Sequence, residues 1–175
     1  MKKNIMALCG VSLLFLSVGA EAADWYQSYD SDEMRGTSTR FIQTRSDNSV
    51  DFSFPYNGGA RMSIILRSKK TQLKAGQQPS SLKPAEVLLV MDKGQFICSS
   101  YDDCSVSVKF DSGKVLQYSV SKSADADSKV FFIDNAQSFI KNISTHKSLI
   151  IEADFFQEGS KQFKFDLSGY STPKE

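Results

Sequence analysis

The chain has 175 residues, of which 41% are hydrophobic and 23% are charged, and its formal net charge at pH 7 is +1. A chain this close to neutrality has no overall electrostatic field that would recruit nucleic acid or anionic lipid, so its partners must be recognised by local shape and chemistry. These values exclude a strongly basic nucleic-acid binder and are typical of an ordinary domain with a hydrophobic core.

The N-terminus has the pattern of a secretory signal peptide. A Lys2-Lys3 start is followed by the apolar run "IMALCGVSLLFLSVGA", and small residues occupy the cleavage positions at Ala20 and Ala22. We expect cleavage after residue 22, so that residues 23–175 form a single mature β-rich domain with 19 basic and 19 acidic residues. The alternative is an uncleaved N-terminal anchor.

The mature chain is expected outside the cytoplasm. A short signal with a Lys-Lys start is typical of Gram-negative bacteria, which predicts the periplasm or a secreted location. No second apolar run of about 20 residues follows the signal, so we expect no membrane insertion after cleavage.

Apolar and polar residues alternate with a period of two along most of the mature chain, which in an extended strand places the apolar residues on one face. The first alternating unit is interrupted by "PYNGG", whose asparagine and glycines tolerate the positive φ values of a turn. We expect a β-hairpin here. Its apolar residues are Val50, Phe52, Phe54, Met62, Ile64 and Leu66.

The segment 68–85, "SKKTQLKAGQQPSSLKPA", is polar and has no period. It contains two prolines and four lysines and no acidic residue. A polar stretch of this length inside a compact domain is either a loop in solvent or a binding segment. A loop in solvent is the preferred interpretation.

The second alternating unit is predicted to be a three-stranded antiparallel meander with turns at "SSYDD" and "DSGK". The first turn pairs Cys98 with Cys104. The second pairs Phe110 with Leu116, which places Val106 opposite residue 120. Both registers place the same apolar residues on one buried face. These residues are Phe96, Cys98, Cys104, Val106, Val108, Phe110, Leu116, Tyr118 and Val120.

The last part of the chain predicts a helix and a third hairpin. Residues 134–143 carry the helix signal, because Asp134 is a suitable N-cap, Gln137 follows three residues later, and apolar residues then recur at helical spacing. The hairpin turns at "QEGS". Its apolar residues are Leu149, Ile151, Ala153, Phe155, Phe163, Phe165 and Leu167. The expected fold is therefore mainly β, with antiparallel sheets, a β-sandwich or a partial barrel built of hairpins and one short α-helix.

The residues that most enzyme classes need are scarce. His146 is the only histidine, and no G-x-S-x-G motif presents a nucleophile. We interpret His146 as a contact to the last carbonyls of the preceding helix. Zinc-site spacing, a helix-flanked calcium loop and a phosphate-binding glycine loop are all missing from the sequence. We expect a non-enzymatic protein without a metal or cofactor.

The two cysteines at 98 and 104 are expected to form a structural disulfide. Their shared parity places them opposite each other on the buried face, at a separation that a cross-strand disulfide can span. Redox-active pairs are more often C-x-x-C in electropositive surroundings, whereas Asp102 and Asp103 lie between these cysteines. The tip between them would then be exposed and available to a partner.

Three aromatic residues fall outside the alternating pattern. Trp25 and Tyr26 follow the cleavage site, and Tyr56 lies in a predicted turn. A tryptophan near a terminus usually anchors the first strand to the core, and the alternative is a partner-facing anchor, a role that suits tryptophan and tyrosine. The candidate partner-binding residues are Trp25, Tyr26, Tyr56, Tyr101, Asp102 and Asp103.

Several landmarks together resemble a loose set of small secreted proteins of Gram-negative bacteria that are β-rich, carry one disulfide and have no common assigned activity. They are the start at Trp25, "DEMRG", "FPYNGG" with "ILRS", "KGQFICSSYDDCSVSVKFDSGK", the short helix and "LIIEADFFQEGSKQFKFDLSGY". The resemblance covers nearly the whole mature chain. It implies one exported β-rich domain with one disulfide, and it carries over no catalytic residue.

The leading functional expectation is an exported, non-enzymatic protein that binds another protein in the cell envelope. Such a protein would be an accessory of an envelope or secretion system, an inhibitor or an immunity protein. The alternative is a small-ligand or envelope-polymer binding protein with a cleft between the sheet and the helix, and a carboxylate-based hydrolase is less favoured. Nothing in the pattern indicates an oligomeric state.

Overall fold

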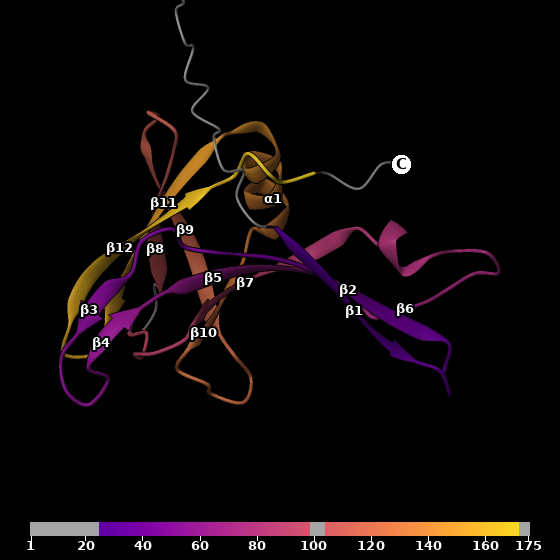
Figure 1. Cartoon of the computed structure of the whole chain (residues 1–175), viewed down its shortest axis with the longest axis horizontal. Helices are drawn as coiled ribbons and strands as arrows, with labels where there is room; N and C mark the ends of the chain where they lie inside the picture. The colour runs from indigo at the N-terminus through magenta and orange to yellow at the C-terminus, as the bar shows by residue number, and fades with distance from the viewer. Residues whose placement is uncertain (1–24, 99–103, 172–175) are drawn as a thin grey trace, which may run out of the picture.

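The computed structural model describes residues 25–98 and 104–171, and the predicted signal peptide lies outside them. Within these ranges the chain is mainly β, with twelve strands, one α-helix and one short 3-10 helix (Figure 1). The elements are β1 (Tyr26–Asp32), β2 (Thr37–Arg45), β3 (Val50–Phe52), β4 (Gly58–Ala60), β5 (Met62–Ser68), β6 (Thr71–Gln72), η1 (Pro79–Ser81), β7 (Pro84–Met91), β8 (Ser105–Phe110), β9 (Val115–Lys122), β10 (Val130–Ile133), α1 (Ala136–Thr145), β11 (Ser148–Phe155) and β12 (Gly159–Asp166).

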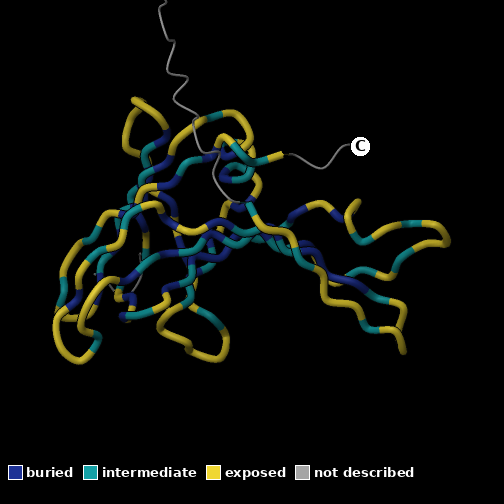
Figure 2. Tube along the Cα trace, in the orientation of Figure 1, coloured by how far each residue is buried: buried dark blue, intermediate teal, exposed yellow. Residues whose placement is uncertain are grey.

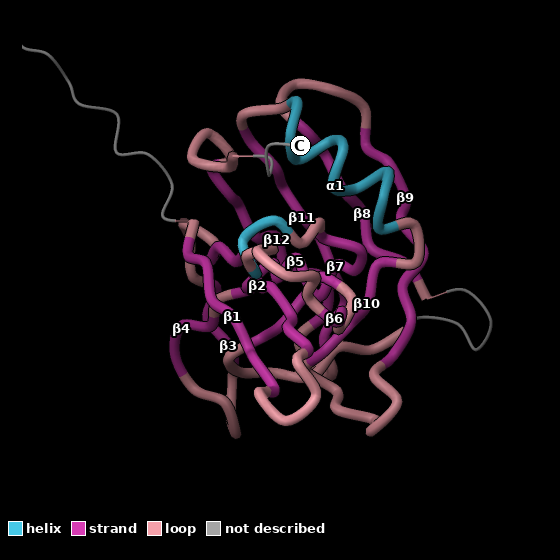
Figure 3. Tube along the Cα trace, turned by 90° about the vertical axis from the view of Figure 1, so that its right-hand side faces the viewer, coloured by secondary structure: helices cyan, strands magenta, loops and turns pink. Residues whose placement is uncertain are grey.

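Ten of these strands form one antiparallel sheet. Its order is β1-β2-β5-β7-β10-β9-β8-β11-β12, with β6 also paired to β2, and β3 and β4 form a separate ribbon. Figure 3 shows β1, β2, β5, β7 and β10 side by side in that order. The β1–β2 hairpin projects to one side of the molecule in Figure 1, whereas β3, β4, β11 and β12 lie at the other side. The expected fold class is therefore confirmed.

An aromatic cluster joins β3, β10, β11 and β12 around the segment that contains Phe96. The ring centroid of Phe155 lies 5.2 Å from that of Phe52, 5.0 Å from that of Phe96 and 5.8 Å from that of Phe163. Phe96 in turn stacks on Phe131, with the centroids 4.3 Å apart. All five side chains are buried, and the dark central segments of Figure 2 mark this core. Buried aromatic rings contribute both apolar area and pair geometry to stability.

The helix forms where the sequence predicts it, but its cap is one residue later. Asn135 is the N-cap, and its side-chain oxygen accepts a hydrogen bond from Ser138 N at 3.2 Å. The carboxylate of Asp134, the predicted cap, instead accepts from Ser121 Oγ at 2.6 Å. Phe139 is fully buried, and the helix packs on β7.

Two predicted hairpins are present, one of them shorter than expected. The β11–β12 hairpin has the expected buried face, with Ile151 opposite Phe163. The first hairpin is only β3–β4, because residues 62–68 form a separate strand of the large sheet. Phe54 was expected in the core, and this is wrong. It follows the end of β3, where a turn begins at Ser53 O, and its side chain is 82% exposed.

The predicted meander is wrong in its neighbours and its register. β8 lies between β9 and β11, and Phe96 forms a bridge with Phe155 rather than with Val106. Val106 pairs with Tyr118, two residues from the predicted position. The reason is that the β8–β9 turn starts at Phe110, whose carbonyl accepts from Gly113 N at 2.9 Å. Even-numbered residues still lie opposite even-numbered residues, as predicted, but Leu116 is exposed instead of buried.

The polar segment 68–85 is not simply a loop in solvent. It contains β6 and η1, and it lies over the buried side chain of Arg40 in β2. Arg40 Nη1 donates to Ser80 O at 2.6 Å and to Leu82 O at 3.3 Å, and Nη2 donates to Gln27 Oε1 at 2.7 Å. These contacts order a segment whose composition alone predicts solvation.

We expect Gly94→Ala to destabilise the protein more than Gly76→Ala. Both glycines have positive φ, +91° and +79°, so both substitutions carry a backbone strain of about 1–2 kcal/mol. An added Cβ at Gly94 would also clash with the ring of Phe52, whereas nothing lies within 4 Å of one at Gly76. The clash adds about 1–3 kcal/mol in the free energy of unfolding. Urea titration of both variants measures the difference, and equal midpoints would contradict the assigned contact.

We expect the double variant Cys98→Ser/Cys104→Ser to fold with a lower melting temperature. The two cysteines form a disulfide with a Cα–Cα distance of 4.8 Å, as the sequence predicts. Closing a ring of seven residues stabilises by about 2.4 kcal/mol in the loop-entropy model. For a domain of this size that corresponds to about 5–10 °C in Tm. Calorimetry measures the shift, and an unchanged Tm would contradict a restraining role.

Candidate functional site

The structure separates the predicted partner-binding residues. The ring centroid of Trp25 lies 4.9 Å from that of Tyr170, and Trp25 packs against the core, so it anchors the start of the described chain. Tyr26 is 61% exposed on β1. Tyr56 lies in the turn between β3 and β4, with its ring centroid 6.4 Å from that of Phe52. Figure 1 shows β1 and the β3–β4 ribbon at opposite sides of the molecule. Residues 101–103, the predicted tip with Tyr101, Asp102 and Asp103, lie outside the described residues.

The disulfide holds the strand-like segment 95–98 near the end of β11. Ile97 N donates to Asp154 O at 3.0 Å, and Phe156 N donates to Gln95 O at 3.0 Å. On the other side of the bridge, Cys104 O accepts from Val120 N at 2.8 Å. Backbone hydrogen bonds therefore link this segment to β11, and the disulfide joins it to Cys104, beside β9.

Three aromatic side chains gather beside Gln95 of this segment, and we call them the aromatic end: Phe54, Tyr56 and Phe156. Phe156 is 51% exposed, so with Phe54 it places two large aromatic side chains in solvent, and Ile97 of the neighbouring segment is also exposed. Phe54, Tyr56 and Phe156 line one small pocket of about 150 Å³, together with Pro55, Gln95, Gln157 and Glu158. Exposed apolar groups that cluster in this way mark interaction surfaces.

A carboxylate holds the two turns of the aromatic end together. Glu158 Oε1 accepts from Ser53 N at 2.6 Å, and Glu158 Oε2 lies 3.4 Å from Lys161 Nζ. The hydrogen bond from the Ser53 N–H is the main cause that lowers the pKa of Glu158, and Lys161 acts in the same direction. The charged form of Glu158 therefore fixes the turn that carries Phe54 to the turn that carries Phe156.

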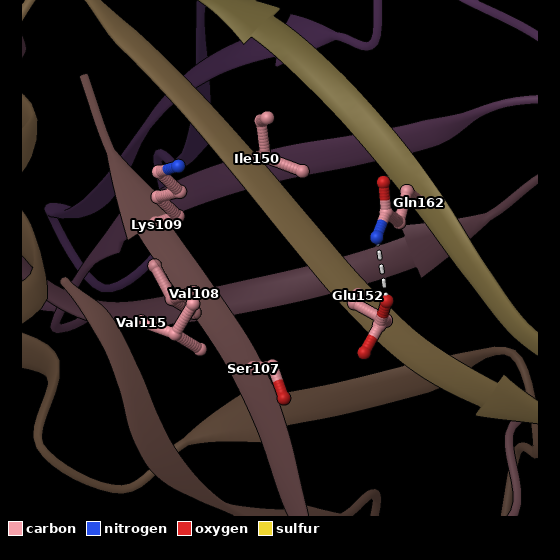
Figure 4. Close-up of a pocket in the computed structure, with 7 residues that line it drawn as sticks. All are labelled: Ser107, Val108, Lys109, Val115, Ile150, Glu152 and Gln162. Atoms are coloured by element: carbon pink, nitrogen blue, oxygen red, sulfur yellow. Dashed lines mark hydrogen bonds between the residues drawn. The ribbon is translucent and has the colours of Figure 1, made fainter. Parts of the chain in front are cut away.

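A second hollow lies on the outer face of the β9-β8-β11-β12 part of the sheet (Figure 4). It has a volume of about 270 Å³, and Val115 and Ile150 provide apolar surface. Gln162 Nε2 on β12 donates to Glu152 Oε2 on the neighbouring strand β11 at 2.6 Å. Of the seven residues drawn in Figure 4, Glu152 is the single acid, so this hollow does not present the paired carboxylates that a glycosidase uses.

A third hollow, of about 420 Å³, lies between β9 and the start of α1. This is the place where the sequence predicts a cleft between sheet and helix. Two of its polar groups already have partners within the chain, because Asp134 accepts from Ser121 and Asn135 Oδ1 caps the helix. Its volume lies in the range of about 300–1,000 Å³ that is usual for small-molecule sites.

The structure also locates the single histidine. His146 Nδ1 lies 2.9 Å from Asn142 O at the end of α1, and its ring centroid lies 5.1 Å from that of Phe110. This is the helix-end contact that the sequence predicts. Within residues 25–98 and 104–171, no three histidine, cysteine, aspartate or glutamate side chains lie close enough to hold a metal ion.

We expect Glu158→Gln to reduce the loss of stability in acid. Because the folded-state pKa of Glu158 is lowered, its contribution is present above its ordinary value of 4.5 and is lost as pH falls through the folded-state pKa. The amide of glutamine keeps an oxygen for Ser53 N but does not titrate. Melting temperatures between about pH 6 and pH 3 measure this, and Glu152→Gln is the control. A fall in melting temperature between about pH 6 and pH 3 as large as that of the unmodified chain would contradict this role of Glu158.

Comparisons with known proteins add no relative from which a function follows. No family model matches the chain, and no curated protein or solved structure matches it. In the part of the chain that the structure describes, no helix has the length and apolar character needed to cross a bilayer. The resemblance to small secreted Gram-negative proteins therefore stays a prediction.

Proposed function

We propose that this chain is an exported, non-enzymatic protein that binds another protein through the aromatic end. The observation that carries the proposal is the exposure of Phe54 and Phe156 on two turns tied together by Glu158. An aromatic ring buries about 150–250 Å² when a partner covers it, and rings held in one geometry lose little conformational freedom on binding. The surface is suited to act as an anchor for a partner.

The size of the pocket favours a protein partner over a small ligand. Sites for small molecules usually have volumes of about 300–1,000 Å³, whereas the pocket between Phe54 and Phe156 has about 150 Å³. A volume of this size accommodates one side chain of a partner, which is how anchors at interface centres are commonly seated. The amides of Gln95 and Gln157 supply a polar rim around it.

The cell envelope is the proposed place of action. Disulfides persist in oxidising compartments, and the Cys98–Cys104 bridge fits the export that the N-terminal sequence predicts. The partner would be a component of an envelope or secretion system, or a protein that this chain inhibits or neutralises. Small-ligand or envelope-polymer binding is the second candidate, and the hollow at the start of α1 is where it would be sought.

We expect Phe54→Ser/Phe156→Ser to abolish capture of the partner while leaving the fold intact. Each ring, as an interface anchor, is worth about 2 kcal/mol, so the double variant should bind about 1,000-fold more weakly. Quantitative pull-down from periplasmic extract, followed by titration with the recovered protein, measures this loss. Calorimetry should show little change in Tm, because both side chains are exposed.

The matched control is Val115→Ser/Leu116→Ser, which removes two exposed apolar side chains at the start of β9. This variant should retain the partner. Equal losses in the two variants would contradict a specific role of the aromatic end, and so would an extract that yields no partner. Thermal shifts with glycans, lipids and peptidoglycan fragments test the second candidate, since a ligand of the native state raises Tm.

A further inference from the structure

The two outer strands of the large sheet differ in how their edges are covered. Beside β12, Asp47 N donates to Lys164 O at 2.8 Å. Asn48 Oδ1 accepts from Lys164 N at 2.7 Å, and Asn48 Nδ2 donates to Gln162 O at 3.0 Å. One asparagine side chain thus takes the place of a neighbouring strand. Covering of this kind is how natural proteins prevent unwanted edge pairing.

The edge of β1 has no comparable cover within the described residues. β1 pairs with β2 along residues 26–32 without a bulge, and none of the strands in residues 25–98 and 104–171 lies on its other side. Its sequence "YQSYDSD" contains no proline and no lysine, and its two charged residues, Asp30 and Asp32, lie in its C-terminal half. Figure 2 shows β1 largely exposed beside the buried β2, and Tyr29 is 45% exposed.

We propose that β1 pairs with β1 of a second copy of this chain, so that the two sheets join into one across a two-fold axis. The axis would pass at Tyr29, which places Tyr29 of one copy opposite Tyr29 of the other. All seven residues of β1 are then paired. Cross-strand aromatic pairs stabilise antiparallel strands, and a two-fold axis requires such a self-complementary edge.

The charges of β1 favour this register. With Tyr29 on the axis, Asp30 lies opposite Ser28, whose hydroxyl can donate to it, and Asp32, whose charge Arg35 and Lys70 already compensate, lies opposite Tyr26. Shifting the axis to Asp30 would place two carboxylates directly opposite each other, which is destabilising. Shifting it to Ser28 would leave two residues of β1 without a partner in the second β1.

The position of β1 allows this contact. The β1–β2 hairpin projects from the rest of the molecule, and Figure 3 shows β1 at the margin of the sheet, so a second copy can approach its edge. The aromatic end lies at the other side of the molecule, near β3 and the β11–β12 turn. The pairing therefore goes beyond the proposed function and leaves both aromatic ends free. One strand pair is small for an interface, so association in the micromolar range is expected.

Sedimentation equilibrium of the mature chain tests the proposal. From about 5 to about 500 µM, the mean mass should rise from that of a monomer towards that of a dimer. Tyr29→Asp places two carboxylates on the axis and should raise the midpoint concentration at least 10-fold. Met34→Asp is the matched control, because Met34 is an exposed apolar residue in the turn of the same hairpin and outside the paired register. It should leave the midpoint unchanged.

A second variant keeps the test independent of any effect of Tyr29→Asp on folding. Tyr29→Cys places two thiols directly opposite across the axis, at a Cβ separation of about 4.5–5.5 Å. Mild oxidation should give a covalent dimer at least 10-fold faster than with Met34→Cys. A monomer at every concentration, or equal rates in the two cysteine variants, would overturn the proposal. Protection of the β1 amides only when another protein is bound would assign the edge to that partner instead.

Discussion

The contact of the Phe155 ring with its neighbours is the constraint on which the rest of the structure depends. It joins β11 to β3, to the segment before the disulfide and to β12, and Phe96 extends it to β10. These segments are far apart in the sequence, so the cluster holds β3, β10, β11 and β12 in one arrangement. Residues in such clusters tolerate little change in volume, because the interior is close-packed.

The same cluster explains why apolar side chains can remain exposed in an ordered arrangement. Phe155 points into the core and Phe156, the next residue, points out, because successive side chains of a strand face opposite sides. Phe52 and Phe54 are two residues apart and would share one face of a continuous strand, but β3 ends at Phe52 and the turn that follows carries Phe54 outward. Glu158 joins the two turns through Ser53 N. Core packing thus determines the geometry of the surface above it.

The sequence predicts well which face of a strand is buried, and it predicts poorly which strands are neighbours. Alternation identified the buried residues of β11 and β12 correctly, because a period of two defines a face without knowledge of the partner strand. It could not show that Phe96 lies beside Phe155 rather than Val106. β2 escaped prediction because its buried residues include Arg40, whose charge is compensated by the backbone oxygens of a polar segment. Of the proposed site, Tyr56 was predicted, whereas Phe54 was predicted in the core and Phe156 was given no role.

The two proposals have a joint consequence that neither has alone. A dimer formed through β1 would carry one aromatic end at each far side, because the β1–β2 hairpin and the aromatic end lie at opposite sides of each copy. A pocket for one side chain limits the affinity of each aromatic end. Two linked aromatic ends raise the overall affinity only when two copies of the partner lie within reach of one dimer. Components arrayed in an envelope meet this condition, whereas a freely diffusing monomer does not. Weak edge pairing would then make capture depend on local concentration, since the dimer forms where the chain accumulates.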